Sequence, residues 1–336
     1  FIMSFWFLSS KVIKYCMRII IIILSFLLYQ TSTYSKVSEK NEFNQKYLSN
    51  YFSALISYDN QNNDDALKFF KASKFLIQKH DKFLKEYVFS LVLDGQIKRA
   101  IDQIKVSKNS NNSNFFELNL LLYLDSFAKK KYKKAAKSLK KIESSIDSGT
   151  YEFFIYKIIK SYNDLFLNQK IEKSNDNYGQ LSVITDAFQN CYLDSKKTNS
   201  YFLNLINSAE GDYSRYLFFY LTNIIENKDY NAASEISATI EPLTSSLLIS
   251  QSKNWIENKD FKKFINYFSC KNENHLLSEF FFLISNLFSS QEKFNKSNFY
   301  LSLSNYLNPK FVFNLSLVVE NLYLNKNYEK SITVLK

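Results

Sequence analysis

The side chains that most often carry out catalysis or bind metals are few in this chain and stand far apart. Its 336 residues include two histidines, His80 and His275, and three cysteines, Cys16, Cys191 and Cys270. No two of them lie at metal-ligand spacing, and no nucleophile stands at motif spacing from a histidine. The 4 glycines form neither a phosphate-binding loop nor a dinucleotide fingerprint. We therefore expect a protein without catalytic residues, bound metal or cofactor.

Two further groups of residues are better explained by structure than by chemistry. Asp64 and Asp65 lie together at an expected helix start, where acidic side chains complement the helix dipole. Cys191 and Cys270 could form a disulfide only if the fold brought them together, because their spacing matches no disulfide framework. We expect these two cysteines to stay unpaired.

The formal net charge of +11 raises the question of an anionic partner. Lys, Asn, Ile, Phe and Tyr are over-used together, which is typical of translation from an AT-rich genome, and no basic nucleic-acid motif accompanies the charge. The densest basic run, residues 129–134, spans an expected turn and the start of the next helix. We therefore expect a solvated basic surface and no nucleic acid partner.

A repeated polar turn organises the chain. Residues 223–230, NIIENKDY, return as residues 254–261, NWIENKDF, with weaker copies that end at Tyr132, Phe294 and Tyr328. The aromatic residues that end these turns are 31, 33 and 34 residues apart from position 230 onward. A period of this size indicates one supersecondary unit stacked on copies of itself. With only 4 glycines and 2 prolines to mark tight turns, the units are expected to be helical.

Small residues recur at one position of this unit, and large apolar residues recur four positions later. The small residues are Ala66, Ala100, Ala135, Ala233, Ser297 and Ser331, and the large ones are Phe70, Ile104, Leu139, Phe268, Leu301 and Leu335. Phe264 and Ser237 depart from the pattern. These residues resemble the tetratricopeptide repeat (TPR) family, whose helix-turn-helix units of about 34 residues carry small and aromatic residues in fixed places. The resemblance covers roughly residues 47–142 and 214–336.

The resemblance implies an all-α fold, a TPR-like α-solenoid of stacked helix-turn-helix hairpins that form a right-handed superhelix. Hairpin turns are expected near residues 59–64, 94–97, 128–131, 227–229, 258–260, 290–293 and 325–327. Residues 143–213 are expected to form degenerate helical repeats with a polar loop. The second helix of the last hairpin is barely two turns long, so the stretch 214–336 is expected to be truncated. Other helical solenoids remain the nearest alternative.

The first 35 residues resemble an export signal. Arg18 precedes an apolar run over residues 19–29. That run is shorter than the about 20 residues of a membrane-spanning helix, and small residues at 33–35 suit cleavage before Lys36. Residues 1–35 are therefore expected to be a signal peptide or, if uncleaved, an N-terminal membrane anchor, and 36–46 a linker. We expect an exported protein of the bacterial cell envelope, periplasmic or anchored facing the periplasm.

The TPR resemblance favours a non-catalytic scaffold that binds another protein or peptide in a concave groove. In the family, the first helix of each unit lines that groove, which here implies Tyr51, Leu55, Tyr58, Phe89, Val92, Leu120, Leu124, Phe127, Phe218 and Phe282. Because this lining is apolar, the partner is expected to bind through an apolar segment, and a membrane only through an uncleaved N-terminus. For any one of these residues, packing inside the superhelix is an equal alternative. The alternative function is a superhelical arm of a larger envelope enzyme, such as a lytic transglycosylase, with its catalytic domain beyond residue 336.

Overall fold

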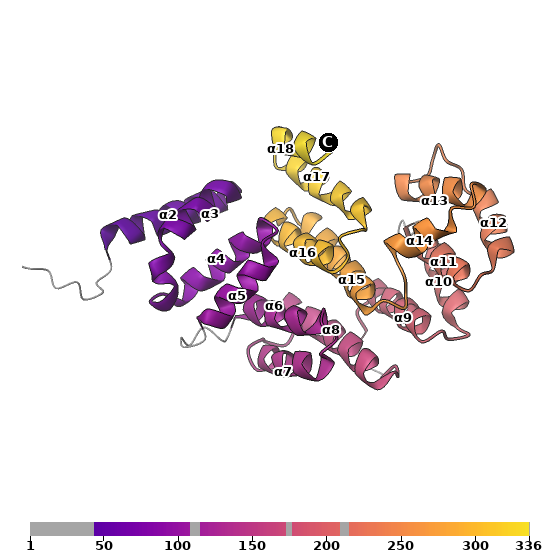
Figure 1. The fold of residues 1–336 in the computed structure, drawn as a ribbon, viewed down its shortest axis with the longest axis horizontal. Coiled ribbons are helices and arrows are strands. Elements are labelled where there is room, and N and C mark those ends of the chain that lie inside the picture. Colours follow the sequence, from indigo (N-terminus) through magenta and orange to yellow (C-terminus); the bar gives the residue numbers. More distant parts are fainter. Residues whose placement is uncertain (1–43, 108–114, 173–176, 209–214, 336) are drawn as a thin grey trace, which may run out of the picture. The chain divides into compact units, whose positions relative to one another are not determined.

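The computed structural model describes residues 44–107, 115–172, 177–208 and 215–335 (Figure 1). Residues 46–336 belong to one compact unit, which is the part described here. The regular elements of the described residues are all helices, which confirms the expected all-α class. None of these helices is long and apolar enough to cross a membrane.

Most of the helices pair with their neighbour in the sequence. Six pairs are α4 (Asp81–Leu93) with α5 (Ile97–Val106), α6 (Phe116–Phe127) with α7 (Tyr132–Glu143), α11 (Arg215–Glu226) with α12 (Tyr230–Ala238), α13 (Leu247–Glu257) with α14 (Phe261–Tyr267), α15 (Glu273–Ser289) with α16 (Phe294–Leu307), and α17 (Leu315–Leu324) with α18 (Tyr328–Leu335). At the start of the described residues, α2 (Gln45–Asp59) meets α3 (Asn63–Ala72) through Tyr51 and Phe70, whose ring centroids are 6.3 Å apart. All seven predicted hairpin turns are confirmed. Such stacked pairs fit an α-solenoid.

The middle of the chain is helical as well. Its two apolar runs form α8 (Tyr151–Asn168) and α9 (Gln180–Tyr192), and a further helix, α10 (Thr198–Ile206), packs against α9. Part of the expected polar loop, residues 173–176, lies outside the described residues. Short 3-10 helices, η1 (Lys74–Gln78) and η3 (Val312–Asn314), precede α4 and α17.

The seven hairpin turns share one backbone conformation. In each turn, the second residue before the next helix has a positive φ; these residues are Gln61, Gly95, Lys130, Lys228, Lys259, Glu292 and Lys326. The following N–H then donates to the carbonyl five residues earlier, as Asp260 does to Trp255 at 2.7 Å. This pattern is the Schellman ending of a helix, which glycine adopts most easily because it has no Cβ. Of these seven turns, only the one at residues 94–96 has glycine at the positive-φ position.

The positions predicted to hold small residues are packing positions. Ala66, Ala100, Ala135 and Ala233 are completely buried, which allows neighbouring helices to approach closely. Among the large residues four positions later, Leu335 differs, since 70% of its surface is exposed.

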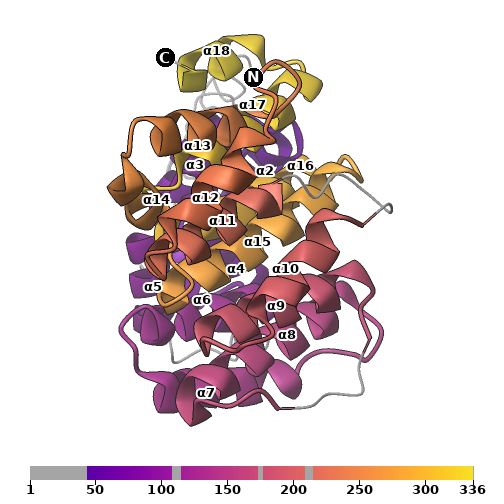
Figure 2. The same cartoon turned by 90° about the vertical axis from the view of Figure 1, so that its right-hand side faces the viewer.

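One hairpin departs from nearest-neighbour stacking. In a solenoid each unit contacts only the units beside it, yet α16 packs on α4 and α5, and α15 packs on α8. Both views show α15 and α16 beside helices from the first half of the chain (Figures 1 and 2). The ring centroids of Phe89 on α4 and Phe299 on α16 are 4.3 Å apart. The α15–α16 hairpin therefore covers faces of α4 and α8 that an open superhelix would leave exposed.

Candidate functional site

The two histidines hold separate parts of the backbone. The Nδ1 atom of His80 accepts a hydrogen bond from the Phe83 N–H at 3.1 Å, which caps the start of α4. The Nδ1 atom of His275 accepts from the Ser269 N–H at 3.0 Å. Burial, with a smaller contribution from the charge of Lys310, lowers the pKa of His275 to about 4. Among the described residues, no three His, Cys, Asp or Glu side chains are grouped closely enough to hold a metal ion.

The expectation that Cys191 and Cys270 stay unpaired is wrong. They form a disulfide that joins the end of α9 to the segment between α14 and α15, with their Cα atoms 5.7 Å apart. Beside it, the Lys271 ammonium group donates to the carbonyl oxygens of Cys191 and Tyr192, each at 3.2 Å. The sequence separation of 79 residues carries no information about this contact, which depends on how the helices pack.

The predicted groove residues do not line an open groove in this structure. Five of them are completely buried, namely Val92, Leu120, Leu124, Phe127 and Phe218; Tyr51 and Phe89 are 6% exposed; and Leu55, Tyr58 and Phe282 are half-buried. Two kinds of packing cover them. Phe127 packs on Phe166 of α8, with ring centroids 5.7 Å apart, whereas Phe89 stacks on Phe299 of α16. Burial of seven of these ten residues agrees with the alternative that they pack inside the superhelix, against α8 at Phe127 and against the α15–α16 hairpin at Phe89.

Phe282 belongs to a structural cluster. The Arg215 guanidinium lies 4.0 Å from the Phe282 ring centroid. The same guanidinium binds both carboxylate oxygens of Glu279, at 2.9 and 2.7 Å, and the Asn314 Oδ1 atom at 2.7 Å. Bidentate pairing of this kind suits a buried carboxylate. The cluster therefore fixes the start of α11 against α15 and the end of η3.

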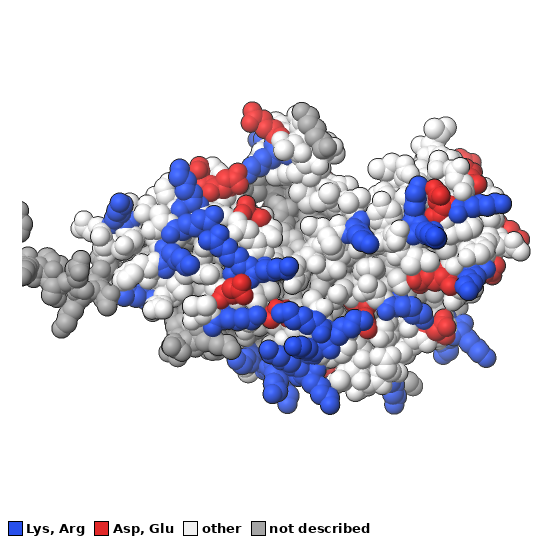
Figure 3. All heavy atoms as spheres, viewed as in Figure 1, with Lys and Arg blue, Asp and Glu red and all other residues white. Residues whose placement is uncertain are grey.

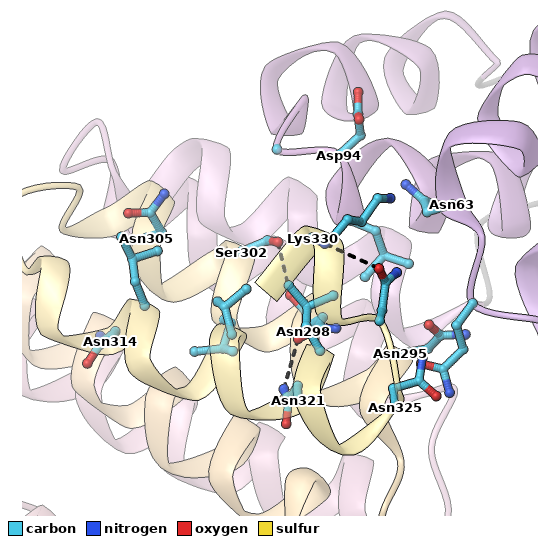
Figure 4. A pocket seen from close by; sticks show the side chains of 18 of the residues that line it. Asn63, Asp94, Asn295, Asn298, Ser302, Asn305, Asn314, Asn321, Asn325 and Lys330 are labelled. Carbon is cyan, nitrogen blue, oxygen red and sulfur yellow. Dashed lines mark hydrogen bonds between the residues drawn. The ribbon is translucent and has the colours of Figure 1, made fainter. Parts of the chain in front are cut away.

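A different site lies where the α16–α18 segment meets the α2–α5 segment. It is a cavity of about 310 Å³, which we call the asparagine pocket (Figure 4). Its polar lining consists mainly of Asn63, Asn295, Asn298, Ser302, Asn305, Asn314, Asn321, Asn325 and Asn327, and its apolar lining of Leu93, Leu301, Phe311, Leu315, Val318 and Leu322. Such an apolar floor with a few directed polar groups is typical of ligand pockets.

Most of the polar lining comes from one face of α16 and from asparagines in and next to α17. Positions 295, 298, 302 and 305 of α16 follow one another at intervals of three or four. Asn314 just before α17, Asn321 within it and Asn325 just after it are seven and four positions apart, with the apolar Val318 between the first two. Residues three or four apart share a helix face. The two helices are joined by the Asn321 carboxamide, which donates to Asn298 Oδ1 at 2.8 Å. This bond, drawn in Figure 4, holds the two rows of side chains in register.

Several carboxamides of the asparagine pocket are already occupied. Asn321 accepts from the Ser289 hydroxyl at 2.6 Å, and Asn295 donates to the Tyr58 carbonyl at 3.2 Å. Among the described residues, by contrast, the side chains of Asn305 and Asn325 make no hydrogen bond, nor does the amide nitrogen of Asn298. The pocket therefore presents rigid, bonded carboxamides beside free ones that both donate and accept.

Three charged groups lie in the pocket lining, and two of them pair with each other. Lys330 of α18 pairs with Asp64 of α3 at 2.8 Å, and Asp94 accepts from the Gln96 amide. Asp94 therefore keeps its negative charge, but its side chain points away from the labelled asparagines in Figure 4. The arrangement suits a neutral ligand that combines an apolar group with amide-like donors and acceptors.

Sequence reasoning missed the asparagine pocket. Its signal was present, since polar residues recur at helical spacing along residues 295–305 and 314–325. Asparagine is common throughout the chain, however, and spacing does not show that two helix faces meet. A larger cavity of about 510 Å³ lies among α8, α9 and α10. Ile171, Glu172 and Tyr178 form part of its wall, and the residues between them, 173–176, lie outside the described residues.

Comparison of the chain with models of protein families, with curated proteins and with solved structures found no match.

Proposed function

We propose that this protein is a non-catalytic scaffold of degenerate TPR-like repeats, and that it binds a segment of a partner protein in the asparagine pocket. The observation that carries the proposal is the row of polar side chains on α16 beside the asparagines in and next to α17, in a cavity that also has an apolar lining. The TPR-like character rests on the repeated turn and on the buried small residues Ala66, Ala100 and Ala135.

Peptide groups are the chemistry that this lining matches best. A carboxamide offers the same donor and acceptor as a backbone amide, so free groups such as those of Asn305 and Asn325 can pair with an extended chain. The apolar floor, with Leu315 and Val318, can accept one or two apolar side chains of the same segment. A cavity of about 310 Å³ is at the small end of ligand pockets, which suits a short anchor rather than a whole helix.

The Cys191–Cys270 disulfide supports an exported location. Disulfides persist in oxidising compartments such as the bacterial periplasm and are rare in the cytosol. We therefore propose that the partner is another protein of the cell envelope.

The asparagine pocket can be tested with displayed random peptides. Peptides are selected on the wild-type protein, and their affinities are then measured for two variants with a matched chemical change. Ser302→Trp fills the pocket, whereas Ser234→Trp places the same side chain on the exposed face of α12. Both serines donate to the carbonyl four residues earlier, at 2.9 Å, so the two substitutions remove the same local bond. Ser302→Trp is expected to weaken binding at least about tenfold, and Ser234→Trp less than about twofold.

A second pair of variants tests the free carboxamides. Asn305→Ala removes an unbonded group at the pocket, and Asn286→Ala removes an exposed asparagine from α15. Only the first is expected to weaken the selected peptides, by about fivefold for a lost hydrogen bond. Selected peptides that bind the wild type and all four variants equally would place the binding site elsewhere.

A further inference from the structure

The positive charge of the chain is concentrated in one short segment. Residues 127–142 contain eight lysines and no acidic residue, so they carry +8 of the formal +11 and leave +3 for the other 320 residues. A lysine-rich composition alone would spread the excess along the chain. The concentration therefore calls for a local explanation.

Helix α7 divides this segment into two opposite faces. Ala135, Leu139 and Ile142 are buried against α6 and α8. Five exposed lysines, 133, 134, 137, 140 and 141, lie within about 120° of one another on the other side, given 100° per residue. They extend along about 12 Å of the helix. We call these five residues the lysine face; Figure 3 shows lysines gathered at the lower margin, where Figure 1 places α7.

Two lysines just before the lysine face in the sequence, Lys129 and Lys130, pair with carboxylates of other helices. Asp125 of α6 pairs with Lys105 at 2.7 Å and with Lys129 at 2.5 Å. Lys130 reaches Glu273 of α15 at 3.0 Å. Within the described residues the lysine face itself makes no ion pair, and Glu143 is the only acidic residue of α7. Its charge is therefore available to an external partner.

We propose that the lysine face docks the protein on an anionic phospholipid surface. Lysines near such a surface each contribute about fivefold to the affinity, and they need no specific geometry. A nucleic acid is the less suitable polyanion, because single strands are held by stacking on exposed aromatic rings. The only aromatic residue of α7, Tyr132, is turned inward against Phe127 and Phe166. The disulfide also indicates an oxidising compartment, where lipid head groups rather than nucleic acids supply phosphate.

The test is co-sedimentation of the full chain with two kinds of vesicle, phosphatidylcholine alone and phosphatidylcholine with about one third phosphatidylglycerol. The neutral vesicles measure any binding through apolar residues elsewhere in the chain. In one variant the lysine face is changed to glutamine (Lys133→Gln, Lys134→Gln, Lys137→Gln, Lys140→Gln and Lys141→Gln). A control variant carries the same change at five scattered exposed lysines, Lys68, Lys98, Lys228, Lys262 and Lys326. A third changes the lysine face to arginine, and circular dichroism checks that all three variants fold.

The wild type is expected to bind anionic vesicles at least about tenfold more tightly than neutral ones at about 0.1 M salt, and to lose the difference at about 0.5 M. The lysine-face glutamine variant should lose the difference, while the scattered variant and the arginine variant keep it. If the two glutamine variants lost this preference for anionic vesicles equally, binding would depend on net charge alone, and the proposal would be overturned. Tighter binding of the wild type to a DNA duplex than to anionic vesicles in the same buffer would also overturn it.

Discussion

Phe89 of α4 and Phe299 of α16 stack on each other, with ring centroids 4.3 Å apart and ring planes 22° from parallel. Through this contact, the α15–α16 hairpin from the last quarter of the sequence packs on the first half of the chain. Neighbouring contacts extend this junction, since Tyr151 and Phe288 meet at 5.6 Å and Tyr162 and Phe280 at 6.4 Å. Aromatic packing therefore closes the faces that the TPR resemblance implied would be free.

The stacked pair should contribute measurably to stability. We expect Phe299→Ala to lower the free energy of unfolding by about 3–5 kcal/mol, because it removes a completely buried ring. A double-mutant cycle with Phe89→Ala should show a coupling of about 0.5–1.5 kcal/mol, measured by urea unfolding. Phe52→Ala is the control, since that ring is 58% exposed and its loss should cost little. Additive effects of the two buried substitutions would show that the rings do not interact.

Replacing a positive-φ turn residue by glycine should stabilise the folded protein. At Lys259, φ is 58°, a conformation that costs a residue with a Cβ about 1 kcal/mol relative to glycine. Lys259→Gly should therefore raise the free energy of unfolding by about 0.5–1 kcal/mol. The same substitution in the middle of α7, Lys137→Gly, should lower it by about 1 kcal/mol. Opposite shifts of the thermal midpoint are the expected result, and a fall in both variants would contradict the turn geometry.

The disulfide predicts a dependence on reductant. It closes a loop with a separation of 79 residues, for which chain entropy gives about 4 kcal/mol of stabilisation. A reducing agent should lower the thermal midpoint of the wild type but not that of the variant with Cys191→Ala and Cys270→Ala. Peptide mapping without reduction should recover the two cysteines linked. Finding both as free thiols in protein purified from an oxidising compartment would contradict the pairing.

His275 predicts a loss of stability in mild acid. Its pKa is lowered on folding from 6.5 to about 4, so between these values the unfolded chain binds a proton that the folded chain does not. The free energy of unfolding is therefore highest above pH 6.5 and falls as the pH drops toward 4. From pH 7 to pH 5 the expected loss is about 2 kcal/mol.

The substitution His275→Asn isolates this effect. The asparagine amide oxygen can still accept a hydrogen bond from the Ser269 N–H, but the amide group does not titrate. Burial raises the pKa of Glu86 and of Glu226, and these carboxyl groups favour the folded state in acid. Only the difference between wild type and variant therefore measures the histidine. Parallel pH profiles from chemical unfolding would show that His275 contributes nothing.

The sequence by itself determined the local structure of this protein. The helix pairs, their turns and the buried small residues such as Ala66 and Ala100 follow from side chains within one repeat. A helix ends where its last carbonyls can be capped, and a small residue is buried where two helices cross, so spacing within about 34 residues is sufficient.

Only the tertiary structure decided which surfaces are free. Phe89 is covered by Phe299, which belongs to a hairpin far along the chain. The Cys191–Cys270 bond and the meeting of Asn298 with Asn321 likewise depend on how hairpins stack. Each stacking step rotates and shifts the next unit slightly, and these small changes add up over many units. Contacts between distant hairpins are therefore set by that sum, which no pattern within a single repeat contains.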